Sequence, residues 1–493
     1  MPIIIPANSA TSGGFDIANS LRFNRASSDS LSFTPDSTTN RRTFTISFWM
    51  KIMKYDIGGS EGGVFNAGQQ PNDNGWFNIQ QGHTSDGDFM SQFYSGAFRN
   101  FKLTQRVMDP SAWYHFVVAM DTTQGTDTNR LKYYVNGTQV TSFSSPIYPD
   151  QNFDTKVSTS GQIQSIGSKR NGSAALTDFF DGYLSEFIMI DGQQLSPTSF
   201  GEFDEDSGIW KPIKSVADLT FGNNGYYLEF KKPGTGTDAS GMGADTSGNN
   251  NHFSVSNLTA VDQSTDTCTN NFATMSTVTW FNGTKANGGL TISTNQTSYR
   301  YQPATIGVSS GKWYWEIKLS SLSEYALMGI TDAASPIQDG TNWILGSGAY
   351  DYSVVNNGNK YNNAGTSPSN TPGDFMGGFS QGNIMMFALD CDNNTLKIGQ
   401  DNSWANGSGL TNQTFSNSTA ISITAPTLTT GGFYFPAVGD YGGATSVFDL
   451  NFGSPPYAIS SGNQDGNGYG NFEYAVPSGY LSLNTKNLSE ANS

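Results

Sequence analysis

Short runs of alternating apolar and polar residues, often closed by a glycine-rich turn, recur along the whole chain and constrain its fold. In residues 43–51 the apolar side chains fall on one face, as in a half-buried strand: Phe44, Ile46, Phe48 and Met50. Residues 311–319 begin with a glycine and are rich in aromatic, β-prone residues. The 56 glycines and 19 prolines among 493 residues favour tight turns over long helices. The sequence therefore predicts an all-β chain with two large domains.

The first half contains further strands of the same kind. Residues 113–120 and 179–190 are predicted strands because aromatic and β-branched residues dominate them. In residues 131–140, Asn136 and Gly137 lie between two β-prone runs, which predicts a hairpin with a type I′ turn.

A short helix is predicted over residues 195–200. Ser196 is its expected cap, and Pro197 stands at the first helical position, where proline is tolerated.

The order of these segments resembles a concanavalin A-like or laminin-G-like lectin sandwich. The resemblance covers residues 15–213 and rests on an ordered set of motifs: Phe48-Trp49, Trp113-Tyr-His-Phe-Val117, Tyr134-Val-Asn-Gly137 and Gly182-Tyr-Leu-Ser-Glu186. Asp191-Gly192 and Gly201-Glu-Phe-Asp204, which follow, resemble repeats of bacteriophage virion proteins. The resemblance implies a binding domain on a virion surface.

The second half resembles a SPRY domain, a β-sandwich that recognises other surfaces. The resemblance covers residues 273–456, and its motifs follow in order: residues 311–319, 325–330, 348–352, 373–378, 383–390, 433–438 and 447–453. One departure is the hairpin after Ile398, where the family usually carries Asn-Gly and this chain has Gly399-Gln-Asp-Asn402. We expect a second sandwich here, with a different turn geometry at that hairpin.

The remaining segments complete the predicted domain order. Residues 1–14 form an N-terminal arm, and residues 214–272 form a connector with a possible strand pair around a glycine-rich loop. Residues 457–493 form a C-terminal extension, of which residues 476–483 are expected to pack on the second sandwich and the last few to fray.

Composition excludes several classes of function. The net charge of −16 argues against binding to nucleic acid or to anionic lipid. No apolar run approaches the length of a membrane span, and the N-terminus lacks the basic residues of a signal peptide. Cys268 and Cys391 fall in different predicted domains, so no disulfide framework is expected, although one long-range bridge stays open. We expect synthesis in the host cytoplasm and location on a virion.

Candidate catalytic and metal-binding motifs are weak. Glucanases of the lectin-like class use Glu-x-Asp-x-x-Glu in a strand, whereas Glu202-Phe-Asp204 lacks the final Glu and lies beside a predicted helix. Asp390 to Asp401 imitates calcium-loop spacing, but Thr395 replaces the required glycine, so an Asx-type turn is predicted. His115 lies in an apolar strand and is expected to be a hydrogen-bonded core or edge residue. No enzyme activity, metal or cofactor is predicted.

Loop aromatic residues near Asp and Asn are the candidate ligand-binding residues, because such rings can stack on sugar faces. For each residue alone, packing in the core is the more common role, and as a set they form a candidate rim of loops: Trp76, Tyr94, Trp343, Tyr350, Tyr352, Trp404 and Tyr441.

The sequence as a whole predicts two antiparallel jelly-roll sandwiches in tandem on a bacteriophage virion. The expected role is a non-enzymatic adhesin, like a tail fibre or head fibre, that binds host cell-surface glycan with avidity from many copies. Other virion proteins are expected partners, and a homo-oligomer, conceivably a trimer, suits a fibre. The alternative is a structural decoration or connector protein whose SPRY-like face binds another virion protein.

Overall fold

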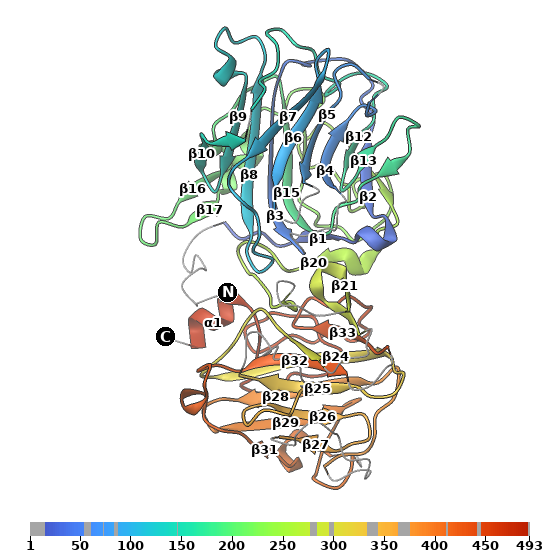
Figure 1. The fold of residues 1–493 in the computed structure, drawn as a ribbon, viewed down its shortest axis with the longest axis vertical. Helices are drawn as coiled ribbons and strands as arrows, with labels where there is room; N and C mark the ends of the chain where they lie inside the picture. Colours follow the sequence, from blue (N-terminus) through green and yellow to red (C-terminus); the bar gives the residue numbers. More distant parts are fainter. Residues whose placement is uncertain are drawn as a thin grey trace. The chain divides into compact units, whose positions relative to one another are not determined.

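The computed structural model describes residues 15–53, 61–71, 73–82, 87–144, 146–276, 283–294, 300–332, 344–362, 375–410, 413–440 and 445–491. The chain divides into two compact units, here called the first unit (Ala10–Thr269) and the second unit (Asn270–Ser493), which are described separately (Figure 1). The predicted arm, residues 1–14, lies outside the described residues. The predicted all-β class is confirmed, because the described part of the chain contains one α-helix, α1 (Thr485–Ala491), and is otherwise strands, turns and 3-10 helices.

Two antiparallel sheets form the first unit. Sheet I has the order β10 (Thr138–Val140), β9 (Leu131–Val135), β8 (Tyr114–Asp121), β3 (Thr43–Ile52), β15 (Gly182–Asp191), β1 (Ser20–Phe23) and β20 (Gln263–Ser264), with β18 (Tyr226–Leu228) beside β15. Sheet II has the order β11 (Phe143–Ser144), β7 (Phe98–Leu103), β6 (Phe89–Tyr94), β5 (Phe77–Gln81), β4 (Gly62–Ala67), β12 (Gln164–Ile166), β2 (Ser30–Phe33) and β19 (Ser254–Ser256).

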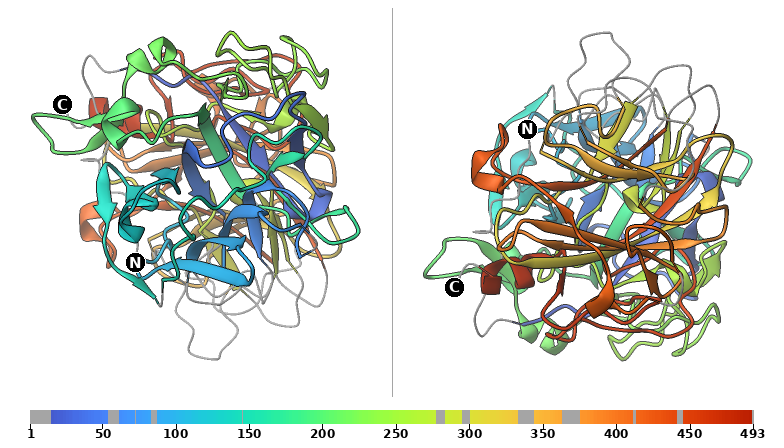
Figure 2. Two further views of the ribbon diagram at one scale, coloured as in Figure 1. Left: turned by 90° about the horizontal axis from the view of Figure 1, so that it is seen from above. Right: turned by 90° about the horizontal axis from the view of Figure 1, so that it is seen from below.

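Two small hairpins lie outside these sheets. The strand β13 (Lys169–Arg170) pairs with β14 (Leu176–Thr177), and β16 (Gly201–Phe203) pairs with β17 (Trp210–Pro212). The second hairpin projects from the first unit (Figures 1 and 2). The 3-10 helices of this unit are η2 (Arg25–Ser27), η3 (Asp127–Asn129), η4 (Pro197–Ser199), η5 (Lys214–Asp218) and η6 (Ala260–Asp262).

The core of the first unit is the apolar layer between sheets I and II. The predicted alternation of β3 is confirmed, because Phe44, Ile46, Phe48 and Met50 are fully buried in this layer. The ring of Phe48 stacks on Phe116 and on Phe187, with centroids 5.6 and 5.3 Å apart. Each buried ring of this size stabilises the fold by about 1.5–3 kcal/mol.

The local predictions for the first unit hold with one correction. Asn136 and Gly137 both have positive φ, 45° and 76°, which is the type I′ hairpin expected between β9 and β10. Pro197 begins the short helix η4, as predicted. Ser196 precedes this helix but its side chain does not cap it; the hydroxyl pairs with Thr198 Oγ1 at 2.7 Å instead.

The connector contributes two strands to the first unit. We expected a strand pair in residues 214–272, but the two strands lie in different sheets: β18 pairs with β15 in sheet I, and β19 pairs with β2 in sheet II. The glycine-rich loop between them therefore crosses from one sheet to the other. The physical reason is that each strand has a sheet edge or gap beside it, whereas an isolated two-stranded pair is only marginally stable.

The segment that follows β15 covers the outer face of sheet I. Ile188 and Ile190 of β15 and Val117 of β8 pack there against Phe200 and Phe221. His115 lies on the same face, where Trp210 Nε1 donates to its Nδ1 at 2.9 Å and its Nε2 pairs with Ser47 Oγ at 2.9 Å. Burial lowers the pKa of His115 to about 3, so the ring is neutral. This confirms the prediction of a hydrogen-bonded core histidine.

A second sandwich forms the second unit. Sheet III has the order β21 (Thr284–Ala286), β22 (Thr291–Ser293), β33 (Val447–Asn451), β24 (Lys312–Ser321), β28 (Ile384–Asp390), β29 (Thr395–Gln400) and β30 (Ser403–Trp404), with β31 (Ile421–Ser422) beside β29 and β34 (Leu481–Ser482) beside β24. Sheet IV has the order β23 (Arg300–Pro303), β32 (Phe435–Asp440), β25 (Leu327–Thr331), β26 (Tyr352–Val355) and β27 (Lys360–Tyr361). Its 3-10 helices are η7 (Asn287–Gly289), η8 (Phe415–Asn417) and η9 (Pro426–Leu428).

Two turns and one strand of the second unit can be compared with the sequence predictions. Asp401 and Asn402 have φ of 48° and 67°, so Asp-Asn makes the two-residue turn where the family usually has Asn-Gly. Asp390 Oδ1 accepts the backbone N–H groups of Asp392 and Asn393, which is the predicted Asx-type turn. The strand expected over residues 348–352 begins only at Tyr352, because the residues before it form a turn.

The C-terminal extension packs on the outer face of sheet III, as expected for residues 476–483. β34 pairs in parallel with β24, and Phe472 and Tyr480 pack against Tyr314 and Trp404. The Glu316 carboxylate is a buried anchor of this extension. It accepts the backbone N–H groups of Glu473 and Tyr474 at 3.0 and 2.8 Å, together with the Tyr314 hydroxyl and the Asn451 amide. The helix α1 that follows was not predicted.

Each unit buries a glutamate whose pKa is raised. Burial raises the pKa of Glu186 to about 7 in the first unit and that of Glu316 to about 7 in the second. Glu186 lies at a β-bulge of β15, between Ser185 and Ile188, and has a left-handed φ of 48°. Its carboxyl group accepts the Tyr227 hydroxyl. The bulge holds the side chain where water cannot solvate its charge.

We expect Glu186→Gln to flatten the pH dependence of stability. The pKa of about 7 in the folded state exceeds the ordinary glutamate value of 4.5, so the native state holds the proton more tightly than the unfolded state does. The contribution of Glu186 to the free energy of unfolding is therefore present in full below about pH 4.5 and is lost as the pH rises to about 7. The loss is roughly 3 kcal/mol. Urea unfolding between pH 4.5 and 8 measures this loss. Glu202→Gln, at an exposed glutamate, is the control; equal slopes for wild type and Glu186→Gln would contradict the assignment.

Candidate functional site

The outer face of sheet II differs from the other outer sheet faces. Apolar clusters cover the outer faces of sheets I, III and IV, centred on Ile190, Tyr314 and Leu327 respectively. Within the described residues, none of the apolar clusters lies on the outer face of sheet II. Its strands β4, β5, β6 and β7 alternate core residues with polar residues that point away from the core. We call this surface the amide face.

A row of amide side chains crosses the four strands in register. Asn66 of β4 is opposite Asn78 of β5, Asn78 is opposite Gln92 of β6, and Gln92 is opposite Asn100 of β7. The Asn78 amide donates to Gln92 Oε1 at 3.4 Å, and its oxygen accepts the backbone N–H of Gln92 at 3.1 Å. Asn66 and Asn78 are fully buried and Gln92 is nearly so, and only Asn100, at the β7 end of the row, is exposed. Ser165 and Ser32 continue it beyond Asn66.

Several buried polar atoms of the amide face have no hydrogen-bond partner among the described residues. They are both amide atoms of Gln80, the side-chain oxygen of Asn66 and the indole nitrogen of Trp76. All three residues are fully buried. A buried polar group without a partner costs about 1–3 kcal/mol.

An aromatic row flanks the amide row. Tyr94 of β6 is opposite Phe98 of β7, and the Phe98 ring packs against Trp76 with centroids 5.5 Å apart. Trp76 is buried, Tyr94 is half-buried, and Phe98 is 44% exposed, which is unusual for a phenylalanine. The exposed ring and the tyrosine provide a stacking surface beside the amides.

The row on the other side of the amide row carries one charged side chain, that of Lys102. Gly63, Gln80, Met90 and Lys102 are opposite one another on β4 to β7. Lys102 forms an ion pair with the buried Asp88, which also pairs with Arg106. The positive charge at this edge is therefore engaged within the protein.

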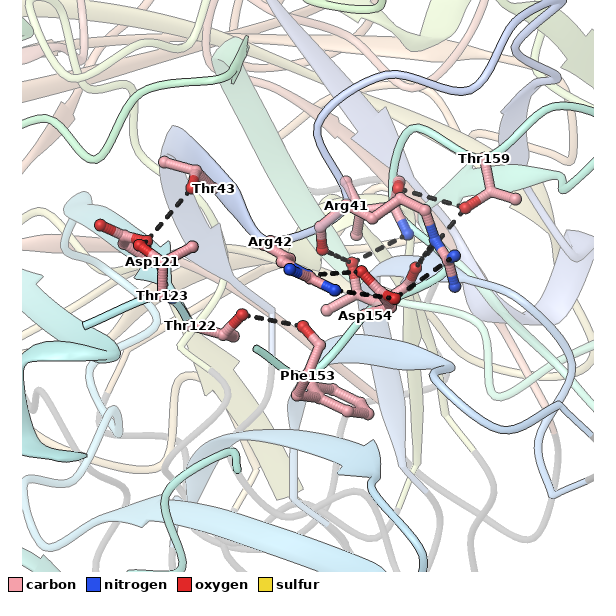
Figure 3. Close-up of polar contacts among 11 residues, drawn as sticks. Arg41, Arg42, Thr43, Asp121, Thr122, Thr123, Phe153, Asp154 and Thr159 are labelled. Atoms are coloured by element: carbon pink, nitrogen blue, oxygen red, sulfur yellow. Dashed lines mark hydrogen bonds and ion pairs between the residues drawn. The ribbon is translucent and has the colours of Figure 1, made fainter. Parts of the chain in front are cut away.

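A clamp of charged residues fixes the loop behind the aromatic row. The Asp154 carboxylate accepts a hydrogen bond from Arg42 Nε at 2.8 Å and lies 3.8 Å from Nη1 of Arg41. Figure 3 shows both contacts. The hydrogen bond from Arg42 lowers the pKa of Asp154. In the same loop, Thr122 Oγ1 donates to the carbonyl of Phe153 at 2.8 Å.

This loop in turn positions the turn before Trp76. The backbone N–H of Lys156 donates to the Gly75 carbonyl at 2.7 Å. A Cβ at Gly75 would lie 2.5 Å from the backbone carbonyl oxygen of Asp154. Gly75 also has a φ of 97°, so a glycine is required for this close approach. The clamp thus holds Trp76 against Phe98.

The structure brings together two of the aromatic residues predicted for ligand binding. Trp76 and Tyr94 both belong to the aromatic row. Tyr350 is half-buried in the second unit, while Tyr352 is buried against Tyr434 and Trp404 is buried against Phe415. Buried rings, Trp76 included, present no face to a sugar, which leaves the half-buried Tyr94 and Tyr350 as the predicted aromatic residues with an accessible ring among those described. Two further predicted residues, Trp343 and Tyr441, lie outside the described residues.

Neither of the acidic candidates forms a catalytic pair. Glu202 lies in the short strand β16, where we expected no strand, and Asp204 accepts the Ser207 backbone N–H at 2.9 Å and the Lys211 ammonium at 3.0 Å. These hydrogen bonds lower the pKa of Asp204, as in the solvated acidic turn that was predicted. The cavity beside Glu186 and His115 has a volume of about 10 Å³, which is room for about one water molecule and too small for a sugar.

The amides themselves were missed, although the sequence carries a signal for them. In residues 77–81, 89–94 and 98–103 the polar alternate positions include Asn78, Gln80, Gln92 and Asn100. Solvent-facing strand positions more often carry threonine or charged residues. Repeated amides at matching positions of neighbouring strands are therefore informative once the register is known.

Comparison with known protein families finds a match within the first unit. Residues 25–198 match the family model described as the concanavalin A-like lectin/glucanases superfamily. No curated protein sequence matches the chain significantly.

Among solved structures, the chain is similar to the heptameric SAP-like pentraxin of Limulus polyphemus, with 17% identity, 37% of this chain and 80% of that chain covered, and a TM-score of 0.27. It is similar to the SPRY domain of human HERC1, with 13% identity, coverage of 33% and 87%, and a TM-score of 0.24. It is also similar to a putative carbohydrate binding protein from Bacteroides ovatus, with 14% identity, coverage of 49% and 58%, and a TM-score of 0.34.

We expect Gln80→Met to stabilise the first unit. The substitution keeps the length of the side chain and removes two buried polar atoms that lack partners. The free energy of unfolding should rise by about 1–3 kcal/mol in urea. Gln139→Met, at an exposed position of β10, should change it by less than about 0.5 kcal/mol. A loss of stability in Gln80→Met would show that the amide makes a stabilising hydrogen bond.

Proposed function

We propose that this chain is a non-enzymatic glycan-binding protein and that the solvent-exposed end of the amide face is its binding surface. The observation that carries the proposal is the exposed pair Phe98 and Asn100 on β7, beside the half-buried Tyr94, on a domain that matches a lectin superfamily. Each amide both donates and accepts hydrogen bonds, as sugar hydroxyl groups do. The rings of Tyr94 and Phe98 offer apolar area to the faces of sugar rings.

The chemistry of the amide face supports binding over cleavage. Glycoside hydrolysis needs two carboxyl groups at a defined separation across the bond that breaks. The strand positions of the amide row, the aromatic row and the row of Gly63, Gln80, Met90 and Lys102 carry no carboxylate within the described residues. Asp88, beside them, is held by Lys102 and Arg106. Such a surface can hold a sugar chain without acting on it.

The proposed setting is the surface of a bacteriophage particle, as a tail-fibre-like or head-fibre-like adhesin. The resemblance of residues 191–204 to repeats of phage virion proteins supports this setting, and so does the turn-rich chain with only 13% charged residues. Many copies on one particle would convert weak single sites into firm attachment. A homo-oligomer and contacts of the second sandwich with other virion proteins belong to the same proposal.

Binding of the purified protein to bacterial cells tests the proposal. We expect saturable binding that is lost when surface polysaccharide is stripped, and at least fivefold weaker binding for Phe98→Ala. Phe203→Ala is the matched control, because Phe203 is also exposed, at 51%, and also packs on a tryptophan, Trp210. Equal loss in both variants would refute the assignment of the amide face. Absence of binding in multivalent form would favour the alternative, a decoration or connector protein.

A further inference from the structure

We propose that Lys51 and Asp266 of the first unit condense into an amide bond between their side chains, which links β3 covalently to the segment after β20. Among the lysine–carboxylate pairs of the described residues, this is the pair in which both side chains are only 1% exposed. In each of the other pairs at least one side chain is 17% or more exposed. The proposal goes beyond glycan binding and does not depend on it.

The fold holds both side chains in place before they react. Lys51 lies on the outer face of sheet I opposite Tyr183 of β15, and its Nζ is 5.6 Å from the centre of the Tyr183 ring. The Asp266 backbone is fixed on both sides: its N–H donates to Ser264 Oγ at 3.0 Å, and its carbonyl accepts the Ser20 hydroxyl at 2.6 Å. The two side chains are therefore already positioned, and positioning is a large part of the free-energy cost of joining two groups.

The reacting atoms are close together, and the amide oxygen has a hydrogen-bond donor waiting for it. Lys51 Nζ donates to Asp266 Oδ2 at 2.8 Å, which places the nitrogen about 3.5 Å from the carboxyl carbon, near the separation from which attack begins. Trp113 Nε1 donates to the other oxygen, Oδ1, at 3.1 Å. This hydrogen bond polarises the carboxyl group and stabilises the negative charge that develops on Oδ1 during the attack.

The condensation needs no other reactant. The Lys51 ammonium group first passes a proton to Asp266 Oδ2 along their hydrogen bond, which gives an amine and a carboxylic acid. The amine lone pair then forms a bond to the carboxyl carbon. The bond from this carbon to Oδ2 breaks, and Oδ2 leaves as water after it takes a second proton from the nitrogen. The product is an uncharged amide whose oxygen, Oδ1, keeps the hydrogen bond from Trp113.

Burial supplies the driving force. Two charges removed from water carry a desolvation cost that their mutual attraction offsets only in part. Amide formation removes both charges from the site and releases a water molecule to the solvent. In a solvated pair, by contrast, water stabilises both ions. The bond would also join residues 215 positions apart, and a link across so long a loop restricts the unfolded chain strongly.

Mass spectrometry of the intact, denatured protein tests the proposal. We expect a mass lower than that of the sequence by one water molecule, and a tryptic digest should contain a branched peptide that joins the fragments carrying Lys51 and Asp266. Lys51→Arg keeps the charge but lacks the nucleophilic amine, so this variant should have the full mass of its own sequence. Lys169→Arg is the matched control. Lys169 is only 2% exposed, but its partner Glu61 is 21% exposed, so the loss of water should persist in this variant.

Two further variants follow the chemistry. Asp266→Asn should lose one ammonia molecule in place of water, because a side-chain amide then provides the leaving group. Trp113→Phe keeps an aromatic ring and removes the donor to Oδ1, so the linked form should accumulate at least about tenfold more slowly.

The opposite results are equally clear. A wild-type mass equal to that of the sequence, both in fresh protein and after prolonged incubation of the folded protein, would overturn the proposal. A loss of water that persists in Lys51→Arg, or that maps to an Asp-Gly sequence elsewhere in the chain, would overturn it as well.

Discussion

The stacked rings of Phe48, Phe116 and Phe187 join the centre of sheet I to the core of the first unit. Such packing uses one face of every strand, and the opposite face must then be either covered or polar. The chain covers sheet I with the segment after β15 and sheet III with its C-terminal extension. Sheet II carries amides on its outer face, and most of these are buried. The candidate site is therefore the β7 end of this face, where Phe98 and Asn100 are exposed.

The two buried glutamates show that polar groups have other uses in this fold. Glu316 accepts four hydrogen bonds and holds the C-terminal extension on sheet III, so its role is structural. Glu186 is held at a strained bulge beside a cavity smaller than a ligand pocket. The amides of Gln80 and Asn66 differ from both, because the described residues give them incomplete hydrogen bonding.

Sequence patterns predicted much of the local structure for clear reasons. Alternation in β3 and the Asn136-Gly137 turn depend on neighbouring residues only, and both are confirmed. The pairing of a strand was predicted wrongly where the strand beside it is far away in the sequence. The strands β18 and β19 were expected to pair with each other and instead join separate sheets. Trp404 is a candidate for ligand binding as a loop aromatic residue near Asp and Asn, and in the structure it packs beside η8 and the distant C-terminal extension.

The sequence by itself determined the all-β class, the strands and the tight turns, because side-chain alternation and backbone preference act over a few residues. It also contained the amides and rings of the candidate site. Only the tertiary structure decided that Asn66, Asn78, Gln92 and Asn100 form one row, because register is set between strands and a shift of one residue would turn every side chain to the other face. It also decided which outer face stays polar, because that depends on where distant segments such as residues 193–221 and 457–484 pack.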